Sequence, residues 1–379
     1  MQKDSRQAPR VIHFVTGGFS GATQVAIDLC LAAQASQAMP VKLVLRKKRN
    51  TAALKIKALQ DQGLDVEVVP GWSHLATILA FKRICQQWQP DILVAHGFSD
   101  HIWSRLAGLW AKVPLMVHVE HNSRERYTAW RLKLSLWLST RTAAIVGVSE
   151  GVKSRLIELG FPPEKCMAIS NGVAWAKFES KPIPLWSERQ PHVIMASRFA
   201  KQKDQPTLIQ AIRILQDQQV QTRLSLAGLG KSQLLRQSQK MAAQCGLQNQ
   251  IDFLGHVANM PALLAQHQIF VLSTHYEGMP LALIEAMASG CACIGTDVVG
   301  VREVIQQGVT GLLVPENNAP ALANAIAMLL ADPEKAENLG RAARSAVQQS
   351  YTLQVMNDNY TRLLFDLDRH NKASSLASI

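Results

Sequence analysis

Long apolar runs are missing from this sequence. No stretch approaches the roughly 18 consecutive apolar residues that a membrane-spanning helix requires. The first ten residues, MQKDSRQAPR, are polar and include Asp4, whereas a signal peptide needs an apolar segment near the N-terminus. We therefore expect the chain to stay in the cytoplasm.

Cysteine is scarce and scattered. The six cysteines include no C-x-x-C pair, although zinc sites and redox motifs require ligands clustered at short spacings. The nearest pair, Cys291 and Cys293, lies in an apolar run that is typical of a buried strand. We therefore interpret the cysteines as buried thiols and predict no metal site from them.

Negative charge is scarce in the first half of the chain. Residues 1–180 contain 23 Lys and Arg against 13 Asp and Glu, a net charge of +10 out of the total of +12. This surplus indicates an anionic partner, and the candidates are nucleic acid, acidic lipid and a phosphorylated or acidic acceptor. The alternative is a generally basic surface that only keeps the protein soluble. Nucleic acid is disfavoured, because the sequence has no aromatic-rich RNA motif and no zinc finger.

Short apolar runs alternate with amphipathic segments, which predicts β-α-β units and parallel sheets. The last amphipathic stretch, 352–369, is expected to follow the second series of runs directly, and the tail 372–379 is expected to be disordered. The predicted strands are 11–17, 41–45, 91–97, 114–121 and 143–149 in the first series, and 192–197, 223–228, 251–255, 269–273, 291–295 and 311–315 in the second.

The 379 residues suit two domains. The predicted fold class is α/β, with two tandem Rossmann-like doubly wound domains that face a central cleft. Ligands of such sheets bind beyond the carboxyl ends of the strands. The predicted parts are an N-terminal domain at 1–175, a linker at 176–190, a C-terminal domain at 191–350 and a helix at 351–370 that crosses back to the N-terminal domain.

The most informative motif runs from Thr274 to Gly290. It follows an apolar strand, Pro280 suits the first helical position, and Gly290 suits a helix end. Exposed N–H groups at the helix start, residues 278–281, would form an anion site. With Glu277 in the turn and Glu285 on the helix, two carboxylates flank this site, which suits a ligand with phosphates and hydroxyls, such as a nucleotide sugar.

A second motif, Ser197 to Asp204, also follows a predicted strand. Arg198 can bind phosphate oxygens through its planar fork, and Lys203 adds a compact positive charge. Such a pair alone is more often a solvated turn. Its combination with the two glutamates favours a phosphate site.

These residues carry a resemblance to the retaining GT-B glycosyltransferases of family four. Glu277 and Glu285 match the family's E-x7-E motif, and Arg198 and Lys203 match its R-x4-K motif. The similarity covers residues 10–366, and further matching segments are 16–18, 148–152, 170–173 and 253–255. Two segments depart from the family pattern: 297–303 has one glycine where a pair is common, and 17–22 lacks a Glu-Arg pair.

The resemblance implies roles for individual residues. Arg198 and Lys203 would hold the donor diphosphate, and Glu285 would accept hydrogen bonds from the ribose. Glu277, with the backbone of 278–281, would fix the transferred sugar and the phosphate. The implied donor-binding set is Gly17, Gly18, Asn171, Arg198, Lys203, Phe253, Leu254, Glu277, Gly278, Met279, Pro280, Leu281 and Glu285, and the implied catalytic set is His121, Glu277, Arg198 and Lys203.

His121 ends a predicted strand in the basic half. In similar enzymes a histidine at this strand end touches the donor sugar or the reaction centre, and the alternative is a structural histidine bonded to a backbone carbonyl. His118 lies within the strand and is interpreted as structural. His96 ends the preceding strand, and a place in the acceptor pocket and a structural role are equally favoured for it.

The resemblance also implies the reaction. We expect transfer from a nucleotide sugar, with a UDP-sugar favoured, to a glycan or lipid-linked glycan in bacterial cell-surface polysaccharide or lipopolysaccharide synthesis. The anomeric configuration would be retained, and neither a cofactor nor a metal would be required. The alternatives are a GT-B nucleotide-sugar epimerase, which uses no acceptor, and a carbohydrate-binding scaffold without activity.

Basic residues accompany Trp and Leu in segment 130–138, and further cations lie at 46–49, Lys55, Lys57, Arg124, Arg126 and Arg141. This combination suits the headgroup region of an anionic membrane surface, on the inner face of the cytoplasmic membrane. The alternative is that Leu and Trp belong to the core and only the charges face water.

Overall fold

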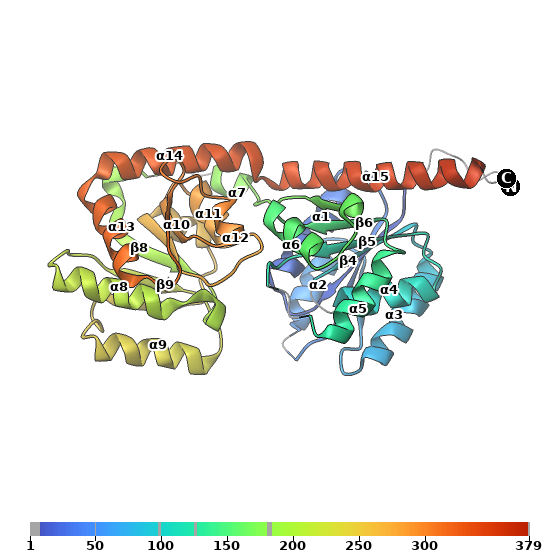
Figure 1. The fold of residues 1–379 in the computed structure, drawn as a ribbon, viewed down its shortest axis with the longest axis horizontal. Helices are drawn as coiled ribbons and strands as arrows, with labels where there is room; N and C mark the ends of the chain where they lie inside the picture. The colour runs from blue at the N-terminus through green and yellow to red at the C-terminus, as the bar shows by residue number, and fades with distance from the viewer. Residues whose placement is uncertain (1–7, 50, 98–99, 125–126, 180–183, 378–379) are drawn as a thin grey trace. The chain divides into compact units, whose positions relative to one another are not determined.

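The computed structural model describes residues 8–49, 51–97, 100–124, 127–179 and 184–377. The chain forms two compact units, each with a parallel sheet covered by helices (Figure 1). The N-terminal unit contains residues 1–171 and 353–379, and the C-terminal unit contains residues 172–352. The predicted α/β class with two Rossmann-like domains is therefore confirmed.

The N-terminal unit has a seven-stranded parallel sheet of order β3-β2-β1-β4-β5-β6-β7. Its strands are β1 (Val11–Thr16), β2 (Val41–Arg46), β3 (Val66–Val69), β4 (Ile92–His96), β5 (Leu115–Glu120), β6 (Ala144–Gly147) and β7 (Cys166–Ala168). Its helices are α1 (Gly21–Ala35), α2 (Ala53–Asp61), α3 (His74–Trp88), α4 (Asp100–Trp110), α5 (Ala129–Ser139), α6 (Glu150–Glu158) and α15 (Leu353–Ala377).

Side chains alternate between two cores on the faces of this sheet. Phe14 of β1 packs with Phe81 of α3 and Ile102 of α4 on one face. Its neighbour Val15 packs with residues of α1 and β2 on the other face. Strands buried on both faces read as continuous apolar runs, which is why the sequence showed them clearly.

The C-terminal unit has a six-stranded parallel sheet of order β10-β9-β8-β11-β12-β13. Its strands are β8 (Gln190–Ala196), β9 (Leu224–Ala227), β10 (Ile251–Gly255), β11 (His267–Leu272), β12 (Ala292–Thr296) and β13 (Leu312–Val314). Its helices are α7 (Ala176–Glu179), α8 (Gln205–Asp217), α9 (Ser232–Gln244), α10 (Met260–Ala265), α11 (Leu281–Ala288), α12 (Val299–Arg302), α13 (Ala319–Ala331) and α14 (Pro333–Ser350).

The C-terminal end of the chain differs from the prediction. α13 and α14 lie between β13 and α15, so the stretch 352–369 does not follow the strands directly. α15 continues to Ala377, so residues 372–377 of the predicted disordered tail are helical, and 378–379 lie outside the described residues. Within the described part of the chain, no helix is long and apolar enough to span a membrane.

The boundary between the units falls after Asn171. The segment predicted as a linker, 176–190, is counted with the C-terminal unit. There Arg344 of α14 donates a hydrogen bond to the carbonyl of Phe178 at 3.1 Å and stacks on Trp175. α15 belongs to the N-terminal unit, where it packs against α1 and β5.

Candidate donor site and the residues around it

The motif residues of the C-terminal unit lie where the strand order of its sheet reverses. β8 and β11 are neighbours although they are not consecutive in sequence. Segment 197–204 follows β8, and segment 273–281 follows β11. Because both strands run in the same direction, the two segments meet at one edge of the sheet, where doubly wound folds bind their ligands.

Hydrogen bonds tie the two segments together. The backbone N–H of His275 donates to the carbonyl of Gln202 at 2.8 Å, and the Thr274 hydroxyl donates to the same carbonyl at 2.9 Å. The Gln202 amide donates in return to the carbonyl of Tyr276 at 2.6 Å. The loops that carry the R-x4-K and E-x7-E motifs are therefore hydrogen-bonded to each other.

Lys203 and Glu277 form an ion pair between these two loops. Nζ of Lys203 lies 2.5 Å from Oε1 of Glu277, and their side chains are only 13% and 8% exposed. Oγ1 of Thr274 lies 2.9 Å from the same oxygen, and Oε2 accepts a hydrogen bond from the Gln202 amide at 3.3 Å. A carboxylate accepts about four hydrogen bonds, so Glu277 keeps acceptor capacity on Oε2 for a ligand.

Sequence reasoning missed this arrangement. It treated Lys203 and Glu277 as separate ligand contacts, and it gave no role to Gln202 or Thr274. Both missed residues lie inside or beside the motifs, but only the pairing of β8 with β11 brings them together.

Arg198 is exposed, in contrast to Lys203. The backbone around it is held in place by Gln205, whose amide donates to the Ser197 hydroxyl at 3.1 Å and to the Arg198 carbonyl at 3.0 Å. The segment ends at Asp204, a left-handed residue whose carboxylate caps the N-terminus of α8. Arg198 therefore presents its guanidinium from a fixed backbone.

The helix that carries Glu285 begins at Leu281 and ends before Gly290. Gly290 has φ +70°, as its predicted place at the helix end requires. Pro280 precedes the first helical residue rather than occupying it, which corrects the prediction by one position. Gly278, Met279 and Pro280 are buried, whereas Glu285 and Leu281 are half-buried on the same face of α11.

Gly300 has a structural role at this site. A Cβ atom on Gly300 would lie 2.3 Å from the carbonyl oxygen of Gly278 and 2.9 Å from that of Glu277. α12 therefore packs directly on the turn that carries the first motif glutamate. This close approach requires a glycine at 300, whereas its neighbour Val299 is 40% exposed.

Phe253 and Leu254, which the resemblance places near the base, lie in β10. The ring of Phe253 is 6.1 Å from that of Phe199, which follows β8 beyond Arg198. Leu254 is 38% exposed. Phe253 and Leu254 are therefore in the same sheet as the motif strands. The Phe253 ring lies near Phe199, which is the residue after Arg198.

The N-terminal unit contains the remaining predicted residues. Gly17 and Gly18 follow β1, and Asn171 follows β7 and is buried. A Cβ atom on Gly17 would lie 2.8 Å from the Arg46 carbonyl oxygen, to which the Gly17 N–H donates at 2.8 Å. Because β1 and β4 are the neighbours at which this sheet's order reverses, Gly17 and Gly18 occupy the edge where ligands are expected.

His121 follows β5 directly and is half-buried. Its Nε2 lies 3.2 Å from Nδ1 of His96, and its backbone N–H donates to Glu120 at 2.8 Å. Burial lowers the pKa of His121 to about 4, although the Glu120 carboxylate acts in the opposite direction. His121 is therefore a neutral imidazole at neutral pH, able to donate one hydrogen bond and accept another.

Three potential metal ligands lie close together in the N-terminal unit. They are His101 of α4 with His118 and Glu120 of β5, whose donor atoms all lie within 4.8 Å of one another. However, Arg105 contacts Nδ1 of His101 at 2.8 Å and can only donate there. The neutral ring then carries its proton on Nε2, which lies 3.0 Å from the Tyr127 hydroxyl. We therefore interpret the group as a hydrogen-bonded network.

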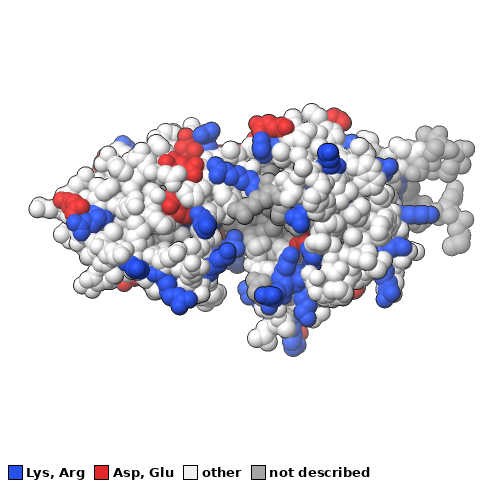
Figure 2. Space-filling model, turned by 60° about the horizontal axis from the view of Figure 1, so that its bottom comes forward, with Lys and Arg blue, Asp and Glu red and all other residues white. Residues whose placement is uncertain are grey.

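The basic surface of the N-terminal unit is smaller than the sequence suggested. Arg46 is buried, with Nη1 2.5 Å from Oδ1 of Asp100, so it is not part of any surface. Arg126 lies outside the described residues. Lys47 and Arg49 remain exposed, and Figure 2 shows Lys and Arg more widespread than Asp and Glu on the face that it draws.

The helix predicted at the membrane surface, α5, has a mixed character. Leu138 is buried in the core, as the alternative interpretation expected. Trp130 and Trp137 are 52% and 43% exposed, and the guanidinium groups of Arg131 and Arg141 stack on them. α5 therefore packs on α4 and the core by one face and presents aromatic and cationic groups on the other.

Comparison with known families covers most of the chain. The family "Glycosyl transferases group 1" matches residues 176–346, and "Glycosyltransferase Family 4" matches residues 19–175. The putative colanic acid biosynthesis glycosyltransferase WcaL of Salmonella typhimurium is 28% identical over 297 residues, which are 74% of this chain and 72% of WcaL. The UDP-Gal:alpha-D-GlcNAc-diphosphoundecaprenol alpha-1,3-galactosyltransferase of Escherichia coli is 22% identical, over 77% of this chain and 80% of its own.

Solved structures share the fold. The crystal structure of HepE from Anabaena, in complex with UDP and glucose, superposes with a TM-score of 0.83 at 20% sequence identity. The match covers 94% of this chain and 99% of HepE. Because the two family matches together span residues 19–346, the chain belongs to the group 1 glycosyltransferases of glycosyltransferase family four.

Proposed function

We propose that this glycosyltransferase moves a sugar from a UDP-sugar to a hydroxyl group of a glycan or lipid-linked glycan, in the cytoplasm. The observation that carries the proposal is the buried Lys203–Glu277 pair beside the exposed Arg198, at the edge where the strand order reverses. Two relatives support a UDP-linked donor: the galactosyltransferase is named for UDP-Gal, and HepE was crystallised with UDP and glucose.

In this proposal the donor is held by charge and by hydroxyl contacts. Arg198 binds diphosphate oxygens through its fork, and Lys203, oriented by Glu277, places a second positive charge beside it. The remaining acceptor capacity of Glu277 is available for a sugar hydroxyl, and Glu285 accepts from the ribose. Phe253 and Leu254 lie by the base.

The proposed reaction retains the anomeric configuration. The acceptor hydroxyl attacks the anomeric carbon from the face that the diphosphate leaves, and a departing phosphate oxygen takes the hydroxyl proton. Catalysis then consists of positioning and of stabilising the charge of the leaving UDP. Arg198 and Lys203 supply that stabilisation, and His121 contacts the transferred sugar.

Activity is expected to survive removal of divalent metals. Two fixed cations at the diphosphate would replace the metal. An Asp-x-Asp pattern can bind a metal, but the one in this sequence, Asp366 and Asp368, lies in α15, where the two carboxylates contact Arg369 and Lys372. The assay measures sugar transfer from labelled UDP-sugars to a panel of lipid-linked glycans, with and without EDTA. A large loss with EDTA that Mg²⁺ restores would contradict metal independence, and a donor converted without any acceptor would indicate an epimerase.

The relatives also suggest the setting. WcaL is named for colanic acid biosynthesis, and the galactosyltransferase name includes a diphosphoundecaprenol acceptor. We propose an acceptor of this class for the present chain, in bacterial cell-surface polysaccharide or lipopolysaccharide synthesis. A lipid-linked acceptor remains in the bilayer, so the enzyme has to reach the inner face of the cytoplasmic membrane.

A surface suited to that contact surrounds Trp103 of the N-terminal unit. Trp103 stacks on His74 at 4.2 Å and lies 6.1 Å from Trp130, so the starts of α3 and α5 flank it. Trp72, just before α3, is 85% exposed. Further exposed apolar or cationic side chains on these two helices are Leu75, Leu79, Arg83, Lys133 and Trp137.

The protein is expected to float with phosphatidylglycerol vesicles at low salt. The replacements Trp72→Ser and Trp130→Ser together should weaken binding by at least tenfold, because exposed aromatic side chains and adjacent cations provide the affinity. Leu185→Ser is the matched control, since Leu185 is 68% exposed but lies in the C-terminal unit. Absence of wild-type binding to anionic vesicles would remove the membrane partner.

A further inference from the structure

Three histidines form a continuous row across the N-terminal sheet. Nδ1 of His13, in β1, lies 3.0 Å from Nε2 of His96, at the end of β4. Nδ1 of His96 lies 3.2 Å from Nε2 of His121, which follows β5. Neighbouring rings are inclined by only 24° and 29°, with centroids 5.3 Å and 5.4 Å apart. The rings therefore meet edge to edge, as an N–H···N hydrogen bond requires.

All three rings are neutral at neutral pH. Burial lowers the pKa of His13 and of His121 to about 4. Burial lowers the pKa of His96 well below its usual value, and its two histidine neighbours act in the same direction. Each ring therefore has one N–H and one bare nitrogen.

Proton counting leaves only two arrangements for this row. If His96 carries its proton on Nδ1, it donates to His121 and accepts from His13, so all three rings are protonated on Nδ1. If His96 carries it on Nε2, it donates to His13 and accepts from His121, so all three are protonated on Nε2. The third proton is then at one of the two ends, either on Nδ1 of His121 or on Nε2 of His13.

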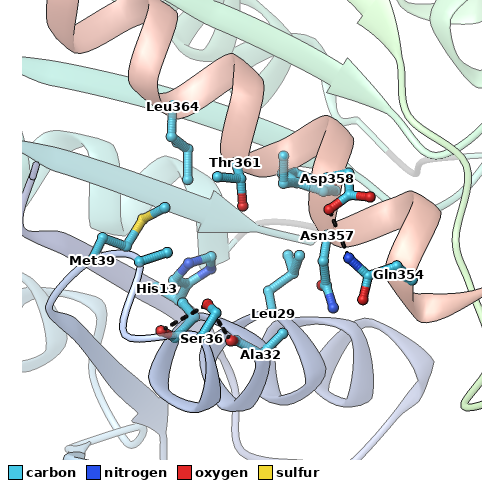
Figure 3. Close-up of a pocket in the computed structure, with 13 residues that line it drawn as sticks. His13, Leu29, Ala32, Ser36, Met39, Gln354, Asn357, Asp358, Thr361 and Leu364 are labelled. Carbon is cyan, nitrogen blue, oxygen red and sulfur yellow. Dashed lines mark hydrogen bonds between the residues drawn. The ribbon is translucent and has the colours of Figure 1, made fainter.

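The two ends of the row have different surroundings. His121 is at the carboxyl end of β5, beside Glu120 and with His118 on the same strand. His13 lines a pocket of about 210 Å³ between α1 and α15 (Figure 3). Polar groups of α15 line the same pocket, among them Asp358 and the buried Tyr360, together with apolar side chains of α1 such as Leu29.

We propose that His13 and His96 are positioning residues that fix which nitrogen of His121 carries the proton, and that the pocket between α1 and α15 controls this choice. A group in the pocket that accepts from Nε2 of His13 selects the Nε2 arrangement, in which His121 presents a bare Nδ1. A group that donates to the same nitrogen selects the Nδ1 arrangement, in which His121 presents a donor. The consequence for catalysis rests on the proposed role of His121.

Two substitutions of His13 are expected to drive His121 in opposite directions. His13→Leu removes the hydrogen-bond partner of His96 Nε2. Because a buried unpaired N–H is costly, His96 should keep its proton on Nδ1, and His121 should then be protonated on Nδ1 as well. His13→Asp supplies an acceptor-only carboxylate, so His96 should donate to it and His121 should be protonated on Nε2. The measurement is the two-bond ¹H–¹⁵N spectrum of histidine-labelled protein at pH 8.

The expected result is the same tautomer at all three wild-type rings and opposite tautomers of His121 in the two variants. Unlike tautomers along the wild-type row, or one and the same His121 tautomer in both variants, would overturn the proposal. Signals of His101 and His118 serve as the control, because unchanged signals show that the variants are folded.

Transfer kinetics give a second, separate readout. The kcat of the two variants should differ by at least tenfold with little change in KM for the donor, because only the hydrogen-bonding role of His121 differs. If neither the wild type nor any variant transfers sugar, the proposed function fails, while the spectra still decide whether the row controls His121.

Discussion

Replacing Lys203 with methionine is expected to lower kcat by about 100- to 1,000-fold, the effect of removing one preorganised charge from a transition state. Lys203 lies 2.5 Å from Glu277 and is largely buried, so water cannot replace the stabilisation that its positive charge gives to the leaving diphosphate. The substitution should also destabilise the C-terminal unit by about 3 kcal/mol, because it leaves a buried carboxylate without its partner. Steady-state transfer assays and urea unfolding measure the two effects.

A double substitution separates the chemical role of Lys203 from its structural role. Lys203→Met combined with Glu277→Gln removes both charges, so most of the lost stability should return. Activity should not return, since the diphosphate still lacks its cation. Recovery of activity together with stability would show that the pair only supports the fold.

Lys201→Met is the matched control. Lys201 lies on the same short 3₁₀ turn, residues 201–203, but its side chain is exposed. Its loss should change kcat by less than about threefold, as expected for a solvated surface charge. An equal loss of activity in this variant would indicate that general positive charge, rather than the placed ammonium group of Lys203, is what matters.

Acidification from pH 7 to pH 5 is expected to unfold the N-terminal unit before the C-terminal unit. Burial lowers the pKa of His13, His118 and His121 to about 4, and those of His96 and His101 lie well below their usual value for the same main reason. Unfolding would return each to about 6.5.

The direction of this pH dependence of stability follows from proton uptake on unfolding. Between pH 6.5 and pH 4 the unfolded chain binds protons that the folded unit does not, so stability falls as the pH falls. Each such ring contributes about 1.4 kcal/mol per pH unit in this window. Above pH 6.5 the rings are neutral in both states and contribute no pH dependence.

Tryptophan fluorescence during urea unfolding at pH 7, 6 and 5 measures this effect, because six of the eight tryptophans belong to the N-terminal unit. Hydrogen exchange read by mass spectrometry then assigns the transition to a unit. His118→Leu should flatten the pH dependence. A midpoint for the N-terminal unit that stays constant from pH 7 to pH 5 would contradict the account.

Strands buried on both faces were predictable from sequence, whereas short or small-residue elements were not. β3 has only four residues and includes Glu67, and β7 has three, so neither shows a clear apolar run. α14 packs through small residues: a Cβ atom on its Gly340 would lie 2.4 Å from the carbonyl oxygen of Gly290. No helix was predicted between 315 and 352, although α14 has distinct apolar and polar faces.

The motif residues were predictable, but their contacts were not. Spacing identified Lys203 and Glu277, yet only the pairing of β8 with β11 brings them together. Likewise, nothing local in the sequence relates His13 to His96, because β1 and β4 become neighbours only when the sheet forms. The basic run 46–49 shows the opposite error. It was predicted to belong to the surface, but its first residue, Arg46, is buried against Asp100.

A calorimetric titration of UDP into the metal-free protein tests the central claim, which is that the Arg198, Lys203 and Glu285 edge of the C-terminal unit binds the nucleotide. We expect micromolar binding that falls at least tenfold on Arg198→Ala and on Glu285→Ala, and that Lys201→Met leaves unchanged. UDP binding that survives both alanine substitutions would contradict this placement of the site. Binding of GDP in place of UDP would retain the site and overturn the choice of uracil as the base.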